Sequence, residues 1–232
     1  MSLIGVSYAA IVIFIRFLER VLCRKVEIVG REHVPRRGPL IVASNHLNNA
    51  DPPIIAAALP RRAVFMAKRE MFSWPVLSWL FKAFGAFPVR RGEADLQAMR
   101  HAMLRLEQGM ALMMFPEGTR SRDARLHRGH PGTAVLAMKT GAPILPVAIY
   151  GTEDVRWPWL FVRPLGIRYV RVTIGEPFFL PKVDRVTTKT AEEYTDLIMR
   201  RVAALLPERY RGEYADAVRD ETEGAPAPAA TV

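Results

Sequence analysis

His46 and Asp51 are the residues whose types and spacing could perform acid–base chemistry. They lie five positions apart in the stretch NHLNNADPP, residues 45–53. Residues at this spacing do not share a helix face, so a contact between them requires His46 to lie on a loop before a helix. The prolines after Asp51 favour a helix start, which predicts Asp51 as the N-cap of a short helix over residues 54–59. A carboxylate placed there would orient the imidazole as a general base. The plain alternatives are a carboxylate that only caps the helix and a histidine that only closes a turn.

A second stretch, FPEGTRSRD at residues 115–123, follows an apolar run that is typical of a strand. The guanidinium of Arg120 and the hydroxyl of Thr119 beside a glycine turn suit a phosphate oxygen. Gly118 would allow close approach of the backbone. Glu117 cannot itself attract a phosphate, so we expect it to orient Arg120 or a substrate hydroxyl.

Together these stretches resemble the glycerolipid acyltransferase family. Its first block is Asn-His, four further residues and Asp, and its third is Phe-Pro-Glu-Gly-Thr-Arg-Ser; both match here without a gap. The stretch at residues 66–92 is similar to the second block, and GAPILPVAIYG at residues 141–151 to the fourth. Four blocks in the family's order identify residues 39–151 with it.

The resemblance implies an O-acyltransferase that moves a fatty acyl group to the free sn-2 hydroxyl of 1-acylglycerol-3-phosphate, giving phosphatidate in phospholipid synthesis. The donor would be acyl-CoA or an acyl-carrier protein, with no further cofactor. His46 would be the catalytic base and Asp51 its orienting partner. Residues 117–120 would bind the acceptor's phosphate, with Lys68 and Arg90 as further basic contacts. The same chemistry on glycerol-3-phosphate or another lysophospholipid, or an inactive membrane-surface binding module, are the alternatives.

Other chemistry finds little support in the sequence. There is no G-x-S-x-G elbow, and Cys23 is far in sequence from both motifs, so we expect direct transfer in a ternary complex without an acyl-enzyme. Asp123, His127 and His130 have a spacing that a metal could use, but no cysteine accompanies them and arginines intervene. We expect a loop there and no metal site.

Composition narrows the class of protein. With 232 residues, half of them hydrophobic, the chain can bury the core of one α/β domain. The net charge of +10 invites a nucleic-acid partner, yet no nucleic-acid-binding motif is present. The basic residues are interspersed with tryptophans and apolar runs, which favours an anionic membrane surface. The single cysteine excludes an internal disulfide and fits a reducing compartment.

The N-terminal residues 1–25 predict a membrane-associating helix. An apolar run over residues 3–15 is too short for a span of about 20 residues, and basic residues follow it. Because a signal peptide carries its charge before the apolar run, we expect retention at the cytoplasmic face of the cell membrane. A helix that packs on the core is the alternative. The aromatic stretches at residues 71–84 and 156–161 are candidates for an acyl-chain groove or for contact with the bilayer. Ordinary core packing is the alternative for the first, and interfacial contact is favoured for the second.

The remaining pattern predicts a single α/β domain over residues 26–210, with a mostly parallel sheet flanked by helices. Buried strands are expected at residues 40–43, 63–67, 111–115 and 144–149. Residues 168–174 alternate, which indicates a strand at an edge or antiparallel position. Since both chemical motifs follow strands, they should share a crevice at the carboxyl ends of the sheet.

Two longer helices are expected, at residues 93–108 and 191–206. The inward faces are predicted to be Leu96, Met99, Met103 and Leu106 in the first, and Tyr194, Leu197, Ile198, Val202 and Leu205 in the second. Residues 211–232 turn acidic and then run into alanine and proline, so they predict a disordered tail.

Overall fold

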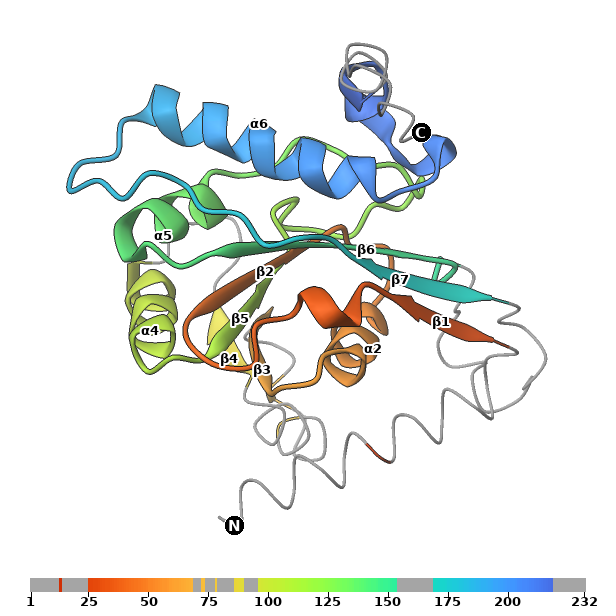
Figure 1. The fold of residues 1–232 in the computed structure, drawn as a ribbon, viewed down its shortest axis with the longest axis horizontal. Coiled ribbons are helices and arrows are strands. Elements are labelled where there is room, and N and C mark those ends of the chain that lie inside the picture. The colour runs from red at the N-terminus through yellow and green to blue at the C-terminus, as the bar shows by residue number, and fades with distance from the viewer. Residues whose placement is uncertain are drawn as a thin grey trace, which may run out of the picture.

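The computed structural model describes residues 13, 25–68, 72–73, 78, 86–89, 96–153 and 169–218. Its centre is a seven-stranded sheet with the order β1-β7-β6-β2-β5-β3-β4 (Figure 1). The strands are β1 (Val26–Val29), β2 (Leu40–Ser44), β3 (Ala63–Lys68), β4 (Phe87–Val89), β5 (Ala111–Met114), β6 (Ile144–Tyr150) and β7 (Val170–Ile174). The helices are η1 (Arg31–His33), α2 (Asp51–Ala58), α4 (Leu96–Glu107), α5 (Gly132–Thr140), α6 (Thr188–Ala204), η4 (Glu208–Tyr210) and η5 (Gly212–Tyr214).

The sheet is mostly parallel, as the sequence predicts. Strands β6, β2, β5, β3 and β4 run in one direction, and β7 pairs antiparallel with β6. The antiparallel position expected for residues 168–174 is thereby confirmed for β7. Strand β1, which the sequence pattern did not reveal, pairs parallel with β7 and forms the outer strand. The carboxyl ends of β2 and β5, two central strands, therefore lie side by side at the same end of the sheet.

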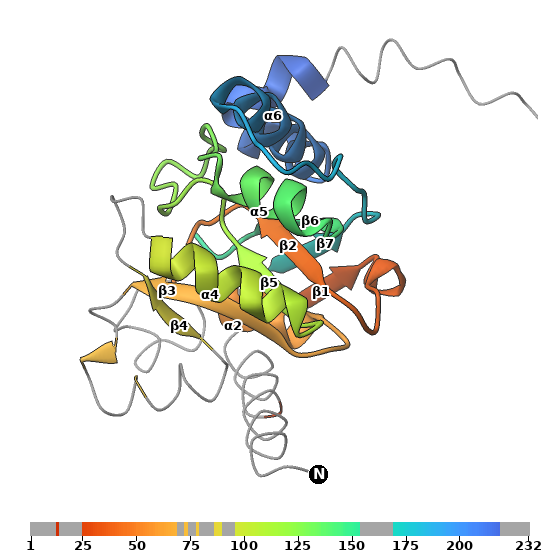
Figure 2. The same cartoon turned by 90° about the vertical axis from the view of Figure 1, so that its left-hand side faces the viewer.

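Helices cover both faces of the sheet. Figures 1 and 2 show α4, α5 and α6 on one face and α2 on the other. Because β2 and β5 are covered on both sides, every residue of these two strands is buried, which explains why both are apolar up to Ser44, the last residue of β2. Each buried aliphatic side chain contributes about 1.5–3 kcal/mol of transfer free energy, so these strands are a rigid base for the loops that follow them.

Helix α4 packs by small residues. The prediction that Leu96 faces inward is wrong, since 68% of its surface is exposed. Its buried residues are Ala98, Ala102 and Leu106, with Met99 and Met103 packed at the margin. Alanines let a helix lie close to its neighbours, which a pattern of large apolar residues does not reveal. In α6 the predicted face is correct, with Ile198 and Val202 buried and Tyr194, Leu197 and Leu205 partly buried.

Helix α2 begins differently from the prediction. Ala50 occupies the N-cap, and Asp51 is the first helical residue with Pro52 and Pro53 behind it. No side chain caps the helix. The prediction of Asp51 as an N-cap is therefore wrong, and its carboxylate is available for other partners.

The packed chain continues beyond Tyr210, where the sequence predicts a tail to begin. Tyr210, Tyr214 and Val218 are buried in a cluster with Leu126 and the end of α6. The amide of Leu126 donates to the carbonyl of Tyr210 at 2.9 Å, and the amide of Glu213 donates to the carbonyl of Leu126 at 3.1 Å. Residues 211–218 therefore belong to the domain, and residues 219–232 lie outside the described residues.

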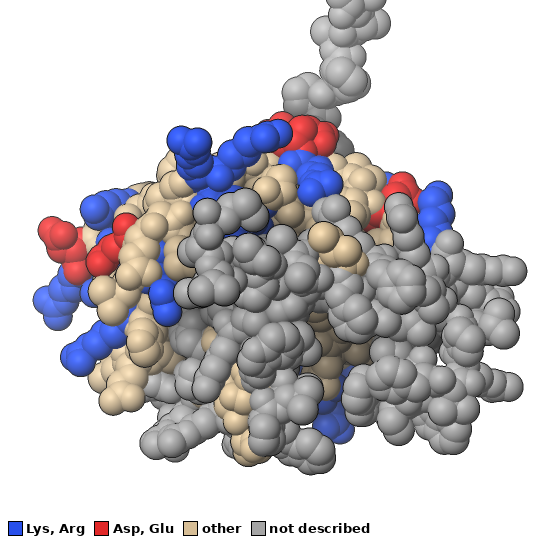
Figure 3. All heavy atoms as spheres, turned by 90° about the horizontal axis from the view of Figure 1, so that it is seen from below, with Lys and Arg blue, Asp and Glu red and all other residues tan. Residues whose placement is uncertain are grey.

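The predicted membrane-facing segments lie largely outside the described residues, as do residues 154–168 and most of residues 69–85. Within the described ranges, no helix combines the length and apolar character needed to cross a membrane. Figure 3 shows Lys and Arg side chains along the described margin of the lower face, with some Asp and Glu residues among them.

Candidate active site

The two sequence motifs meet at the carboxyl edge of the sheet. His46 follows β2 and Glu117 follows β5, and these strands are hydrogen-bonded neighbours. The amide of Ser121 donates to the carbonyl of His46 at 2.8 Å, which joins the two loops directly. The structure therefore confirms that both motifs lie at one place.

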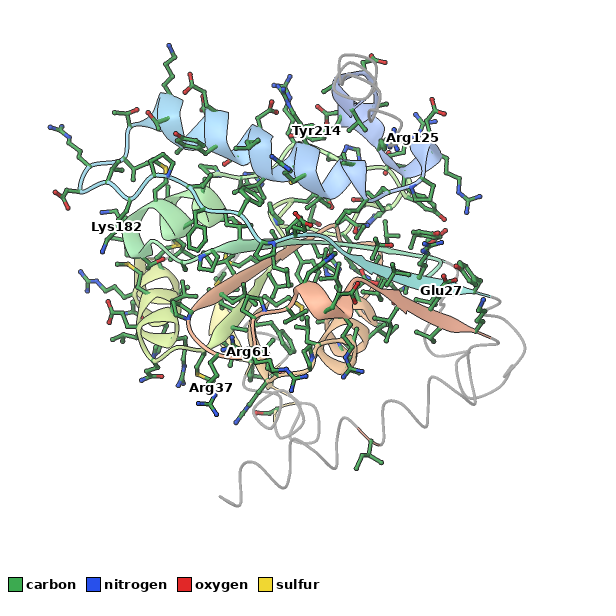
Figure 4. The ribbon with its side chains drawn as sticks, in the orientation of Figure 1. Glu27, Arg37, Arg61, Arg125, Lys182 and Tyr214 are labelled. Carbon is green, nitrogen blue, oxygen red and sulfur yellow. The ribbon has the colours of Figure 1, made fainter. Side chains whose placement is uncertain are left out.

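Figure 4 marks the two ends of the sheet: Arg125 lies in the loop that follows β5, and Arg61 lies at the opposite end. There the Arg61 guanidinium donates to the carbonyls of Pro35, Gly38 and Gly109 at 2.7–3.0 Å. These residues precede β2 and β5, so the arginine fixes the chain at the amino end of the strands. Its role is structural, which contrasts with the arginines after β5.

His46 is held on two sides. Its Nδ1 lies 2.8 Å from Oδ2 of Asp51, and its ring stacks on Phe115 with the centroids 4.2 Å apart and an interplanar angle of 25°. Only 4% of the residue is exposed. A carboxylate oxygen only accepts, so Nδ1 carries the hydrogen and Nε2 presents its lone pair. Nε2 has no hydrogen bond to any of the described residues, which leaves it available to a substrate.

Asp51 is completely buried, yet both of its oxygens are satisfied. Besides His46, Oδ2 accepts the amides of Leu47 at 2.6 Å and Asn48 at 2.7 Å. Oδ1 accepts the hydroxyl of Thr152 at 2.6 Å. The carboxylate thus points back to the loop that precedes it and does not cap α2. Four donors stabilise a charge that burial alone would make costly.

Asn45 extends the sheet by its side chain. Its Nδ2 donates to the carbonyl of Ile149 at 2.8 Å, and its Oδ1 accepts the amide of Ile149 at 2.9 Å. This is the pairing of one strand residue with another, made by an amide group in place of a backbone. This pairing fixes the start of the loop, so that His46 lies just beyond the carboxyl end of β2. The sequence showed the Asn-His pair, but the partner in β6 is too distant in sequence to be inferred.

Glu117 is a buried carboxylate that organises the backbone of both loops. Oε1 accepts the amide of His46 at 3.1 Å, while Oε2 accepts the amide of His127 at 3.1 Å and the hydroxyl of Ser121. Burial raises the pKa of Glu117 above the ordinary value of 4.5, and these three donors oppose the rise in part. No hydrogen bond or ion pair joins it to Arg120 among the described residues, so the structure shows no contact by which it would orient Arg120, and the other expected role, orienting a substrate hydroxyl, stays a prediction.

Gly118, Thr119 and Arg120 are exposed at the turn after Glu117. Gly118 has a φ of 68°, and a Cβ there would lie 2.9 Å from Cδ2 of His130, so any other residue would strain this turn and displace the His130 ring. Within the part of the chain that the structure describes, Arg120 makes no hydrogen bond or ion pair. Its guanidinium is thus free, with respect to these residues, to bind a ligand, and the residue after it, Ser121, contacts the backbone of His46.

The other predicted basic residues are placed in part. Lys68 is the last residue of β3, which pairs with β5, so its backbone ends at the same edge of the sheet. Arg90 lies outside the described residues. The predicted loop at residues 123–130 is held by side chains: Nε2 of His127 lies 2.9 Å from Oδ1 of Asp123, and Arg128 donates to Glu213 at 3.1 Å.

Comparison with known proteins agrees with this geometry. Residues 25–150 match the model of the family described as Acyltransferase. A chloroplastic 1-acyl-sn-glycerol-3-phosphate acyltransferase of Brassica napus is 31% identical over 163 residues, which are 69% of this chain and 47% of that protein. A lyso-ornithine lipid O-acyltransferase of Pseudomonas aeruginosa is 30% identical over 60% of this chain and 55% of its own length. The chain spans about half the length of these relatives.

A solved structure shares the fold. The 1-acyl-sn-glycerophosphate acyltransferase of Thermotoga maritima superposes with a TM-score of 0.64 at 25% sequence identity, covering 85% of this chain and 79% of that one. The matched region contains both loops at the carboxyl edge of the sheet.

Proposed function

The chain belongs to the acyltransferase family, and we propose that it is an O-acyltransferase that moves a fatty acyl group from a thioester donor to the free sn-2 hydroxyl of 1-acylglycerol-3-phosphate. The observation that carries the proposal is the His46–Asp51 pair, with Nδ1 held at 2.8 Å and Nε2 without a partner among the described residues. Relatives named for this activity support the acceptor.

The reaction requires a base and no nucleophile of the protein's own. As the acceptor's hydroxyl oxygen attacks the thioester carbonyl, Nε2 of His46 takes its proton and becomes part of an imidazolium. Asp51 stabilises that charge through Nδ1. The tetrahedral intermediate then expels the thiolate by breaking the carbon–sulfur bond, and the imidazolium returns the proton to the sulfur. The products are the ester and the free thiol, and His46 is again neutral.

We assign the acceptor's phosphate to the turn after Glu117. The guanidinium of Arg120, which has no partner among the described residues, supplies a permanent charge with fixed donor geometry. Gly118 and Thr119, which precede it in the chain, are also exposed. Lys68 and Arg90 are proposed as further phosphate contacts because they lie in the stretch, residues 66–92, that resembles the family's second block. The donor is proposed to be acyl-CoA.

We further propose that the protein works at the cytoplasmic face of an anionic cell membrane, where its lipid acceptor resides. The net charge of +10 supports this, because anionic lipids attract basic residues near the surface by about 1 kcal/mol each. The apolar run at residues 3–15 would supply the second, hydrophobic contribution.

The test is a product assay with purified protein, labelled acyl-CoA and a panel of acceptors. The panel comprises lysophosphatidate, glycerol-3-phosphate, lysophosphatidylinositol and lyso-ornithine lipid. We expect labelled phosphatidate from lysophosphatidate, with turnover reduced by about 10²- to 10⁴-fold in a His46→Ala variant. Absence of any acylated product would overturn the proposed activity, and undiminished turnover by His46→Ala would overturn the role of the base.

The panel also separates the acceptors. A relative named lyso-ornithine lipid O-acyltransferase makes a phosphate-free acceptor the second candidate. Product from lyso-ornithine lipid alone would replace lysophosphatidate as acceptor and remove the phosphate role of Arg120. Labelled protein formed from the donor without acceptor would show an acyl-enzyme and overturn direct transfer.

A further inference from the structure

We propose that Thr152 is a positioning residue of the catalytic pair, acting on His46 through Asp51. This inference rests on the proposed function, because it concerns the same base. Thr152 is fully buried just after the end of β6, and its hydroxyl donates to Oδ1 of Asp51 at 2.6 Å across 101 residues of sequence.

The hydrogen bonds of Asp51 show why this hydroxyl matters. Oδ2 already accepts three donors, from His46, Leu47 and Asn48. Thr152 is the sole partner of Oδ1 among the described residues. A buried carboxylate oxygen without a donor costs about 1–3 kcal/mol or more, so loss of this hydroxyl would disfavour the ionised form that accepts from His46.

The turn that carries Thr152 is itself fixed. Gly151 has a φ of 89°, and a Cβ there would lie 1.9 Å from the carbonyl oxygen of Tyr169, so the turn passes directly against the neighbouring chain. Its amide donates to Oε2 of Glu153 at 2.8 Å, and Oε1 of Glu153 accepts the hydroxyl of Tyr210. Burial, together with this bond to Glu153, raises the pKa of Tyr210 to about 12, so it stays a donor at physiological pH. The hydroxyl of Thr152 therefore has little freedom to move.

Strand β6 and this turn thus hold both ends of the catalytic loop. Ile149 pairs with the side chain of Asn45 at the start of the loop, and Thr152 pairs with Asp51 at its end. His46 lies between them. Because a hydrogen bond donated to Oδ1 favours the ionised carboxylate, the Thr152 hydroxyl helps to maintain Asp51 as the acceptor for Nδ1 and so keeps the lone pair on Nε2.

The test compares Thr152→Val with Thr152→Ser and with Thr195→Val. Thr195 is a matched control, since it is also buried and its hydroxyl donates to a single acceptor, the carbonyl of Ala191 in α6, at 2.7 Å. We expect Thr152→Val to lower kcat by about 10- to 100-fold while the KM of either substrate changes by less than about threefold. The acid limb of its pH–rate profile should move to higher pH. Thr152→Ser should restore kcat to within about threefold of the wild type, and Thr195→Val should keep the wild-type kcat.

A second readout does not depend on turnover. The proton between Nδ1 of His46 and Asp51 gives a downfield NMR resonance when it is held in a short, buried hydrogen bond, and we expect Thr152→Val to shift or broaden it while Thr195→Val leaves it in place. If the wild type transfers no acyl group, the proposed function fails and this resonance alone decides the role of Thr152. Wild-type kcat and an unmoved resonance in Thr152→Val would overturn the inference, as would an equal loss in Thr195→Val or no rescue by Ser. Should Thr152→Val not fold, Thr152→Ala takes its place with the same expectations.

Discussion

The loop after β2 and the loop after β5 lie at the same end of the sheet, but they differ in how far their polar side chains are buried and paired. In the first, Asn45, His46 and Asp51 are at most 4% exposed, and almost every polar atom of their side chains has a partner. In the second, Glu117 and Ser121 are equally buried, but residues 118–120 are exposed, and Arg120 has no partner in the described part of the chain.

The difference follows from what each loop must do. A base has to meet a hydroxyl within a few tenths of an ångström, and small displacements cost rate, so its support is made rigid before the substrate arrives. A phosphate brings its own charge and oxygens, and a guanidinium on an exposed turn can complete its hydrogen bonds with the ligand. The first loop is therefore ordered before the substrate binds, whereas the second keeps hydrogen-bond donors that only the ligand satisfies.

The most severe way to break the first loop is Asp51→Asn. An amide keeps the size of the side chain, but its NH₂ group donates and so opposes the Nδ1 hydrogen of His46, which favours the wrong tautomer. We expect kcat to fall by about 10³- to 10⁴-fold. The free energy of unfolding should fall by about 1–3 kcal/mol, because the backbone amides of Leu47 and Asn48 lose their acceptor. Acyl transfer assays and urea unfolding measure the two effects. A variant with wild-type kcat would show that the pair is structural.

The second loop is tested by Arg120→Ala, which should weaken acceptor binding and leave stability unchanged. Loss of a charge-assisted contact to phosphate predicts a rise in acceptor KM of about 10- to 100-fold. Stability should change by less than about 0.5 kcal/mol, since the side chain removed is exposed and has no partner among the described residues. Arg185→Ala is the matched control, because Arg185 is also exposed. It follows β7, and since β7 runs antiparallel to β6, the carboxyl end of β7 lies at the opposite end of the sheet from the site. Equal KM values in both variants would remove Arg120 from the phosphate site.

Much of this arrangement could be predicted from local sequence. The continuous apolar runs of β2 and β5 indicate strands buried on both faces, and polar residues after them indicate a site at the carboxyl edge. The meeting of His46 with Asp51 and with the loop after β5 follows from these two points. The side chain of Lys68 and the whole of Arg90 lie beyond what the structure describes, so their phosphate contacts stay predictions.

Long-range partners could not be predicted. Thr152 and Ile149 are more than 100 residues from the loop they support, and no periodicity connects them. The direction of the Asp51 carboxylate differs from the prediction because three donors lie behind it, at residues 46–48. The first turn of α2 offers it no free amide, since the two prolines have none and the amides of Asp51 and Ile54 donate to backbone carbonyls. Leu96 was misplaced because alanines, with no bulk to mark them, form the packed face of α4.

The pH dependence of stability sharpens the comparison, because Glu117 is a buried carboxylate in the loop whose residues 118–120 are exposed. Its folded pKa is raised above the unfolded value by burial, so the stability that its proton confers is full below about pH 4.5 and is lost as pH rises through the raised pKa. A Glu117→Gln variant cannot titrate there. We expect it to be less stable than the wild type by about 1–3 kcal/mol, because donors lose their acceptor, and the difference should narrow as pH rises through that window. Thermal unfolding from pH 4 to 8 measures it, and a difference that widens with pH would show a lowered pKa.

The smallest effect is expected where the exposed loop touches the C-terminal segment. Arg128 donates to Glu213 at 3.1 Å, and Nδ1 of His127 lies 3.6 Å from the same carboxylate, but all three side chains are about half exposed or more. Exposed ion pairs contribute about 0–1 kcal/mol, and salt screens them. We therefore expect Glu213→Gln to lower the free energy of unfolding by less than about 1 kcal/mol, with kcat unchanged, and the loss should vanish at 1 M salt.

Buried groups rather than charges should hold the loop to this segment. Leu126 is 1% exposed and exchanges two backbone hydrogen bonds with Tyr210 and Glu213. A Leu126→Ala variant, made beside Glu213→Gln, should cost about 2–5 kcal/mol in urea unfolding, as large-to-small core substitutions do. If Glu213→Gln destabilised the protein as much as Leu126→Ala, ion pairs would hold the loop after β5 to the C-terminal segment. The contrast between a buried, rigid first loop and an exposed second loop would then be wrong.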